Sequence, residues 1–165
     1  MRATLARMAV FLRKLLGIGK LPDAMRAAVE SEGIIHLEEA IPVTFKFSGN
    51  VPGKVAKGNL RGYVGALAIT NHRVLGTLST VPKKAGRAVD HPWHADAGSM
   101  VEASFDASGL LLDVPNLSVV DPKFSGSLSL HYKSALPDEV LASLPQRSFT
   151  FDVPPKFVYS ACGVH

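Results

Sequence analysis

The sequence has one cysteine, few aromatic side chains and no long apolar run. Cys162 cannot form an internal disulfide, so nothing in the sequence indicates an oxidising compartment. Aromatic residues make up 7% of the chain, and no basic segment interleaved with aromatics, as RNA-binding modules use, occurs in it. We therefore expect a cytoplasmic protein without a nucleic-acid partner. If the protein binds a membrane, we expect it to bind at the membrane surface.

The composition predicts a globular, strand-rich domain. Apolar residues make up 47% of the 165 residues and charged residues 19%, while 14 glycines and 11 prolines indicate many turns. A chain of this length forms one core, with at most a helical appendage. We predict an α+β, mainly β fold: an antiparallel sandwich or partly open barrel with two N-terminal helices and a short late helix. The expected boundaries are 1–32 for the helices and 33–165 for the β-rich domain.

Charge is unevenly distributed along the chain. Residues 1–90 carry 14 Lys and Arg against 6 Asp and Glu, whereas residues 91–165 carry 4 against 8. This asymmetry is typical of a surface for anionic partners, and equally of two halves of one fold with complementary charge.

The first 16 residues have the pattern of an amphipathic helix with a basic face. The basic side chains Arg2, Arg7, Arg13 and Lys14 fall on one half of the helical wheel, and Phe11 falls with the leucines on the other. The longest apolar run, 8–12, is too short to span a membrane. Three interpretations stay open: packing against the domain or a partner chain, anchoring at a membrane surface, or an organelle transit peptide.

The pattern along the rest of the chain predicts one more helix near the start, then strands, then a short helix. The expected first segments are a helix over 21–32 and strands over 34–37 and 41–47. Further on we expect a hairpin of 100–105 and 109–114, a strand over 125–133, a helix from Pro137, and a last strand around Phe149.

The segment 63–79 is expected to be the central hairpin. Its two apolar runs meet at Thr70-Asn71-His72, and asparagine tolerates the positive φ of tight turns. Near-continuous apolar strands are typical of elements covered on both faces. The side chains that we expect to be buried are Leu67, Ile69, Val74 and Leu78.

Residues 48–62 have the composition of a mobile, positively charged loop. They contain four glycines together with Lys54, Lys57 and Arg61, a composition suited to binding an anion or a lipid headgroup. The spacing matches no phosphate-binding loop, so a solvated loop without a ligand is the alternative.

The long connection 81–98 holds the candidate metal ligands. Asp90, His91, His94 and Asp96 lie within seven residues, and loop histidines with carboxylates can bind a divalent metal. The alternative is a polar loop in which Trp93 fills a gap. The C-terminal Ser160, Cys162 and His165 include a nucleophile and a base, but no oxyanion donor accompanies them, and we expect no catalytic site there.

The segment GALAITNHRVLGTL resembles a local feature of bacterial pleckstrin-homology-like and GRAM domains. Ile69, Thr70, Asn71, Arg73, Val74 and Leu75 fit their strand-turn-strand pattern, and the segment ESEGIIHLEE is similar to the start of those domains. The resemblance covers about a third of the chain. It implies a sandwich or partly open barrel that binds rather than catalyses.

Two functions follow from these patterns. The first is a non-enzymatic binding module addressed to an anionic membrane surface or a protein partner, without cofactor. The second is a small metal- or ligand-binding β-barrel enzyme that uses the connection 81–98 as its lid or metal loop. The patterns indicate no particular oligomeric state.

Overall fold

The computed structural model describes residues 19–79 and 86–164, and it is mainly β, with eight antiparallel strands and three helices. The predicted mainly β antiparallel fold is confirmed, whereas the choice between sandwich and barrel stays a prediction. The expected first helix, with Arg2, Arg7, Phe11, Arg13 and Lys14, lies outside the described residues. The helices are α2 (Asp23–Ser31), α3 (Asp138–Ser143) and α4 (Pro155–Cys162). The strands are β1 (Ile34–Val51), β2 (Lys54–Thr70), β3 (Arg73–Ser79), β4 (Gly86–Pro92), β5 (Val101–Asp106), β6 (Gly109–Val114), β7 (Ser125–Lys133) and β8 (Ser148–Phe151).

Hydrogen bonding orders the strands β4-β3-β2-β1-β7-β6-β5-β8. The chain divides into two compact units, each formed from two separate stretches of sequence. Of the described residues, unit 1 contains 19–43, 63–79 and 86–93, and unit 2 contains 44–62 and 94–164. The long strands β1 and β2 contribute to both.

The predicted central hairpin is present in unit 1. Strands β2 and β3 pair from Ile69 opposite Val74 to Val64 opposite Ser79. Leu67, Ile69 and Val74 are fully buried, as expected, whereas Leu78 is only half-buried.

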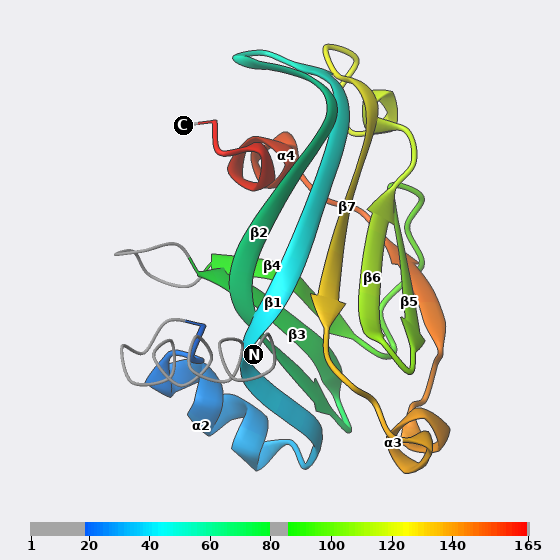
Figure 1. Cartoon of the computed structure of the whole chain (residues 1–165). Coiled ribbons are helices and arrows are strands. Elements are labelled where there is room, and N and C mark those ends of the chain that lie inside the picture. The colour runs from blue at the N-terminus through cyan, green and yellow to red at the C-terminus, as the bar shows by residue number, and fades with distance from the viewer. Residues whose placement is uncertain (1–18, 80–85, 165) are drawn as a thin grey trace. The chain divides into compact units, whose positions relative to one another are not determined.

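Helix α2 covers part of the same unit and lies beside the first half of β1 (Figure 1). Pro22 precedes its first turn, and its last residue is followed by Glu32 and by Gly33 at a φ of 79°. One apolar side of the helix packs on the hairpin strands. This core cluster contains Leu21, Val29, Ala66, Ala68 and Leu75, with Met25 and Leu37 against it.

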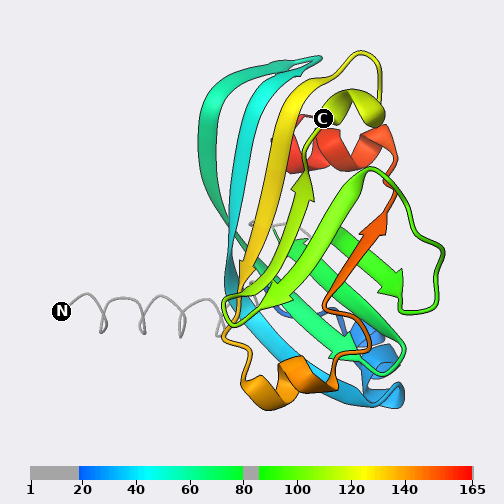
Figure 2. The same ribbon diagram turned by 90° about the vertical axis from the view of Figure 1, so that its right-hand side faces the viewer.

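Unit 2 follows the period of two that its strand sequences predict. Strand β6 pairs antiparallel with both β5 and β7, and β8 adds to the other edge of β5 (Figure 2). One face of these strands forms the core. Its buried side chains are Phe45, Phe47, Val101, Ala103, Phe105, Leu110, Leu112, Val114, Leu128, Leu130 and Tyr132.

Helix α4 is an element that the sequence pattern did not predict. Pro155 stands in its first turn, and Gly163 ends it in the left-handed conformation at a φ of 76°. Its buried residues are Val158, Ala161 and Cys162. The ring of Tyr159 packs edge-on against the ring of Phe124, with the ring centroids 5.3 Å apart.

Three expected connections are corrected. The segments 34–37 and 41–47 belong to one strand, β1, in which Ala40 has a φ of 57° and donates its N–H to the Gly19 carbonyl. Residues 48–62 are not a loop, because β1 and β2 extend through them to a short turn at residues 52–53. The connection 81–98 contains β4, which pairs with β3.

Candidate functional site

The Thr70–Arg73 motif forms a structural clamp in unit 1. Arg73 donates from Nε to Glu32 Oε1 at 3.0 Å and from Nη1 to Asp90 Oδ1 at 3.0 Å. Although burial opposes the charged forms, these hydrogen bonds raise the pKa of Arg73 and, with one from Thr70, lower that of Glu32. The end of α2 is thereby tied to β3 and β4, and the motif has a role in folding.

Thr70 closes the turn between β2 and β3. Its Oγ1 accepts the backbone N–H groups of His72 and Arg73, at 3.1 and 3.0 Å. Its carbonyl accepts the indole N–H of Trp93 at 2.8 Å, and Trp93 is buried. Trp93 thus has the packing role that was the alternative to a metal loop.

The candidate metal ligands have different environments. Asp90 accepts two hydrogen bonds from Arg73, and burial lowers the pKa of His91. The side chains of His94 and Asp96 are exposed. Within residues 19–79 and 86–164, no group of three His, Cys, Asp or Glu side chains is placed to hold a metal ion. The metal hypothesis gains no support from this geometry.

The predicted anion-binding residues do not gather at one place. Lys54 and Arg61 are half-buried, and their positive charges act on Cys162 at the end of α4. Arg61 Nη1 lies only 3.0 Å from where a β-carbon on Gly163 would stand, so the guanidinium covers the C-terminus of this helix. Lys57 is exposed on the other side of β2.

Exposed side chains of β1 and β2 form what we call the hairpin surface, made up of Lys46, Val55, Lys57 and Leu60. Val55 is 73% exposed and Leu60 63% exposed. Gly58, at a φ of 64°, interrupts the alternation of β2, so Leu60 is exposed like Val55 and Lys57. Residues 44–62 carry four basic side chains and no acidic one.

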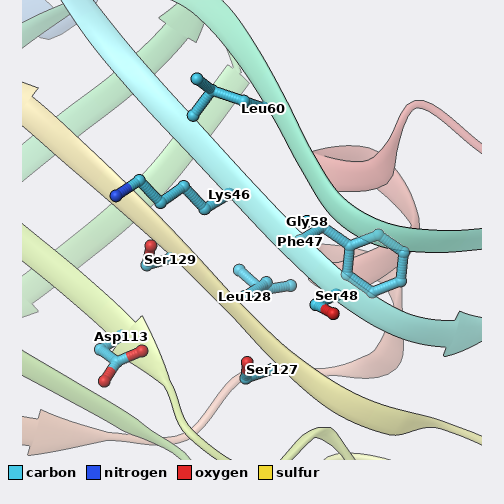
Figure 3. Close-up of a pocket in the computed structure, with 9 residues that line it drawn as sticks. All are labelled: Lys46, Phe47, Ser48, Gly58, Leu60, Asp113, Ser127, Leu128 and Ser129. Atoms are coloured by element: carbon cyan, nitrogen blue, oxygen red, sulfur yellow. The ribbon is translucent and has the colours of Figure 1, made fainter.

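An open depression of about 410 Å³ adjoins the hairpin surface in unit 2. We call it the Lys46 depression, and Figure 3 shows its lining. Polar side chains from three strands point toward it: Lys46 from β1, Ser127 and Ser129 from β7, and Asp113 from β6. The complete lining is Lys46, Phe47, Ser48, Gly58, Leu60, Asp113, Ser127, Leu128 and Ser129.

The depression has one cationic end and one anionic end. Asp113 pairs across strands with Ser129 on one side and with Glu102 on the other. Burial, together with the negative charge of Glu102, raises the pKa of Asp113. Among the described residues, neither Lys46 nor Asp113 has an ion-pair partner. Opposite charges therefore border one polar surface without pairing with each other.

A serine and a histidine meet at the turn between β5 and β6, but not in a catalytic arrangement. Ser108 Oγ lies 3.1 Å from His131 Nε2, yet the hydroxyl donates its proton to Asp106 Oδ1. Nε2 must then be the donor to Oγ, so the imidazole cannot remove the serine proton. This group rigidifies the turn.

Sequence reasoning missed the depression because its polar residues come from strands far apart in the chain. The only signal was the polar half of each alternating strand, as in Ser127-Leu128-Ser129.

Comparison with protein-family models, curated proteins and solved structures found no match to this chain. The resemblance of the segment around Thr70 to pleckstrin-homology-like domains thus stays a prediction. In the part of the chain that the structure describes, no helix has the length and apolar character needed to cross a membrane.

Proposed function

We propose that this protein is a non-enzymatic binding module that attaches to an anionic membrane surface through its hairpin surface. The observation that carries the proposal is the exposure of Val55 and Leu60, 73% and 63%, on the pair of strands that also presents the exposed Lys46 and Lys57. Exposed apolar side chains accompanied by lysines suit the boundary between anionic headgroups and acyl chains. A pleckstrin-homology-like barrel, the finer fold expectation, is compatible with this use.

The energetic scale fits reversible attachment. A lysine close to an anionic leaflet contributes about 1 kcal/mol, and burying a valine or leucine side chain contributes about 1.5–3 kcal/mol. The two lysines and two apolar side chains of the hairpin surface therefore supply at most about 5–8 kcal/mol, which is enough for salt-sensitive binding. The basic, amphipathic sequence of residues 1–16 is a second candidate anchor.

Vesicle sedimentation of the full chain tests the proposal. Vesicles of phosphatidylcholine and phosphatidylglycerol should carry the protein down at low salt and release it at high salt. The double variant Val55→Asp/Lys57→Glu should lose most of this binding. The matched control is Lys133→Glu, which reverses an exposed charge on β7 outside the hairpin surface.

Two results would contradict the proposal. One is wild-type protein that stays in the supernatant at low salt, which would favour a protein partner instead. The other is a double variant that sediments like wild type while deletion of residues 1–16 abolishes binding. The deletion stops before Gly19, because the Gly19 carbonyl accepts the N–H of Ala40.

A further inference from the structure

The Lys46 depression offers separate positions for a negative and a positive group of one small ligand. Strands β1 and β6 lie on either side of β7, so the backbones that carry Lys46 and Asp113 are two strand spacings apart, about 10 Å. In Figure 3 the side chain of Ser129 lies between those of Lys46 and Asp113.

The cationic end suits a phosphate. Lys46 supplies an ammonium, while Ser48, Ser127 and Ser129 supply hydroxyl groups that can donate to phosphate oxygens. No acidic residue occurs in the stretch 44–62 that contributes this end.

The anionic end suits a primary ammonium. Asp113 stands directly opposite Glu102 in the pairing of β5 with β6, and like charges in that position destabilise a sheet. Within the described residues, neither carboxylate has a cationic side chain as partner. A ligand ammonium between them would relieve this repulsion and donate hydrogen bonds to Asp113.

We infer that the Lys46 depression binds a phosphoethanolamine group, with the phosphate at Lys46 and the serines and the primary ammonium at Asp113. Leu60, 63% exposed at the border, meets the apolar part of the molecule that carries this group. The inference rests on the proposed membrane function where it takes the phosphoethanolamine group to be a lipid headgroup. It then predicts that the protein prefers membranes that contain this headgroup. A quaternary choline fits less well, because it has no N–H to donate.

Titration of the full chain with soluble glycerophosphoethanolamine, followed by NMR chemical shifts, tests the depression without a membrane. Saturable shifts should centre on the depression, with weaker binding of glycerophosphocholine, inorganic phosphate and ethylamine. Lys46→Gln and Asp113→Asn should each weaken binding about tenfold, the effect of losing one charged hydrogen bond. The controls Lys133→Gln and Asp96→Asn change exposed residues outside the depression and should bind like wild type. Melting curves show whether each variant is folded.

Equal binding of glycerophosphocholine, or equal binding by folded Asp113→Asn, would overturn the inference. Vesicles separate it from the proposed function. Replacing part of the phosphatidylcholine by phosphatidylethanolamine, at constant phosphatidylglycerol, should increase binding of wild type but not of Asp113→Asn. Binding to phosphatidylglycerol vesicles without this increase would refute the headgroup preference and leave the membrane function standing. Wild-type protein that binds glycerophosphoethanolamine but no vesicles would refute the membrane function. The ligand of the depression would then be a free phosphoethanolamine compound.

Discussion

Arg73 contacts Glu32 through two nitrogens: its Nε lies 3.0 Å from Oε1, and its Nη2 lies 3.0 Å from Oε2. The two side chains are 17% and 18% exposed, so the pair is mostly shielded from water. A two-point contact of this kind fixes direction as well as distance. It orients the end of α2 on the β2–β3 hairpin, whose apolar strands form the core of unit 1.

Arg73→Ala should destabilise the protein. The variant leaves Glu32 and Asp90 without their shared cation, and losing hydrogen bonds to charged groups costs about 1.5–3 kcal/mol. Denaturant unfolding should show this loss as a lower midpoint with an unchanged slope. Lys57→Ala, which removes an exposed charge, should unfold like wild type, and equal midpoints for the two variants would contradict a clamp at Arg73.

Stability should fall in acid partly through Glu32. Burial raises the pKa of this carboxyl, but hydrogen bonds from Arg73 and Thr70 and the charge of Arg73 lower it below its ordinary value of 4.5. Because the folded pKa is the lower one, the stabilisation is complete above pH 4.5 and is lost as the pH falls through the folded value. Unfolding free energies at about pH 6 and about pH 3 should therefore differ less in Glu32→Gln than in wild type. An identical difference in both proteins would count against this linkage.

Ile69→Asp should give insoluble or unfolded protein. Ile69 has no exposed surface and stands opposite Val74 at the end of the hairpin. A carboxylate there would be desolvated without a partner, and even Ile69→Ala should cost about 2–5 kcal/mol. Soluble expression and thermal melting measure both effects. Ile69→Asp that melts like wild type would show that this strand does not form the core.

The strands were predictable where side chains alternate between buried and exposed. Val101, Ala103 and Phe105 lie on the buried face, and Leu110 and Leu112 match them from β6. The prediction succeeds because burying one face of a sheet makes apolar and polar residues alternate along each strand. The strand propensities of these residues do not contradict that alternation.

The prediction of a loop over 48–62 was wrong because it rested on the glycines of this segment. Glycine at a bulge or close crossing is compatible with a strand. Gly49 lies against Ser125, and Gly58 interrupts the alternation of β2. Helix α4 was not predicted, although Pro155 stands at a position that favours a helix start.

The candidate site could not be predicted, since it depends on which strands become neighbours. Lys46, Asp113 and Ser129 approach one another only because β7 pairs with both β1 and β6. No local pattern encodes that order. The motif at Thr70 and Arg73 was visible in the sequence, but the contacts of Arg73 assign it to structure rather than to ligand binding.

Gly126→Ala should destabilise unit 2, whereas Gly62→Ala should not. Gly126 has a φ of 93°, and a β-carbon there would stand 2.0 Å from the carbonyl oxygen of Ser48. Strain of this kind costs at least about 1–3 kcal/mol. Gly62 has no atom within 4 Å of a built β-carbon, and alanine there reduces the entropy of the unfolded chain. Thermal melting should place Gly126→Ala several degrees below wild type and Gly62→Ala at or slightly above it. The reverse order would contradict the close approach of the β1 and β7 backbones at Ser48 and Gly126.

The thiol of Cys162 should be unreactive in the folded protein. Burial raises its pKa from 9.0 to about 11, although the positive charges of Lys54 and Arg61 partly oppose the shift. At pH 8 the thiolate fraction is then about one in a thousand, and the side chain of Cys162 is 1% exposed, so a reagent cannot reach it.

Because this is the only cysteine in the chain, a chromogenic disulfide reagent reports on it alone. We expect slow reaction in buffer and rapid reaction of one thiol in denaturant. The variant Ser160→Cys/Cys162→Ser, which moves the thiol to an exposed position on α4, should react promptly in buffer. Equally fast reaction of wild type and this variant would show that α4 does not pack as described.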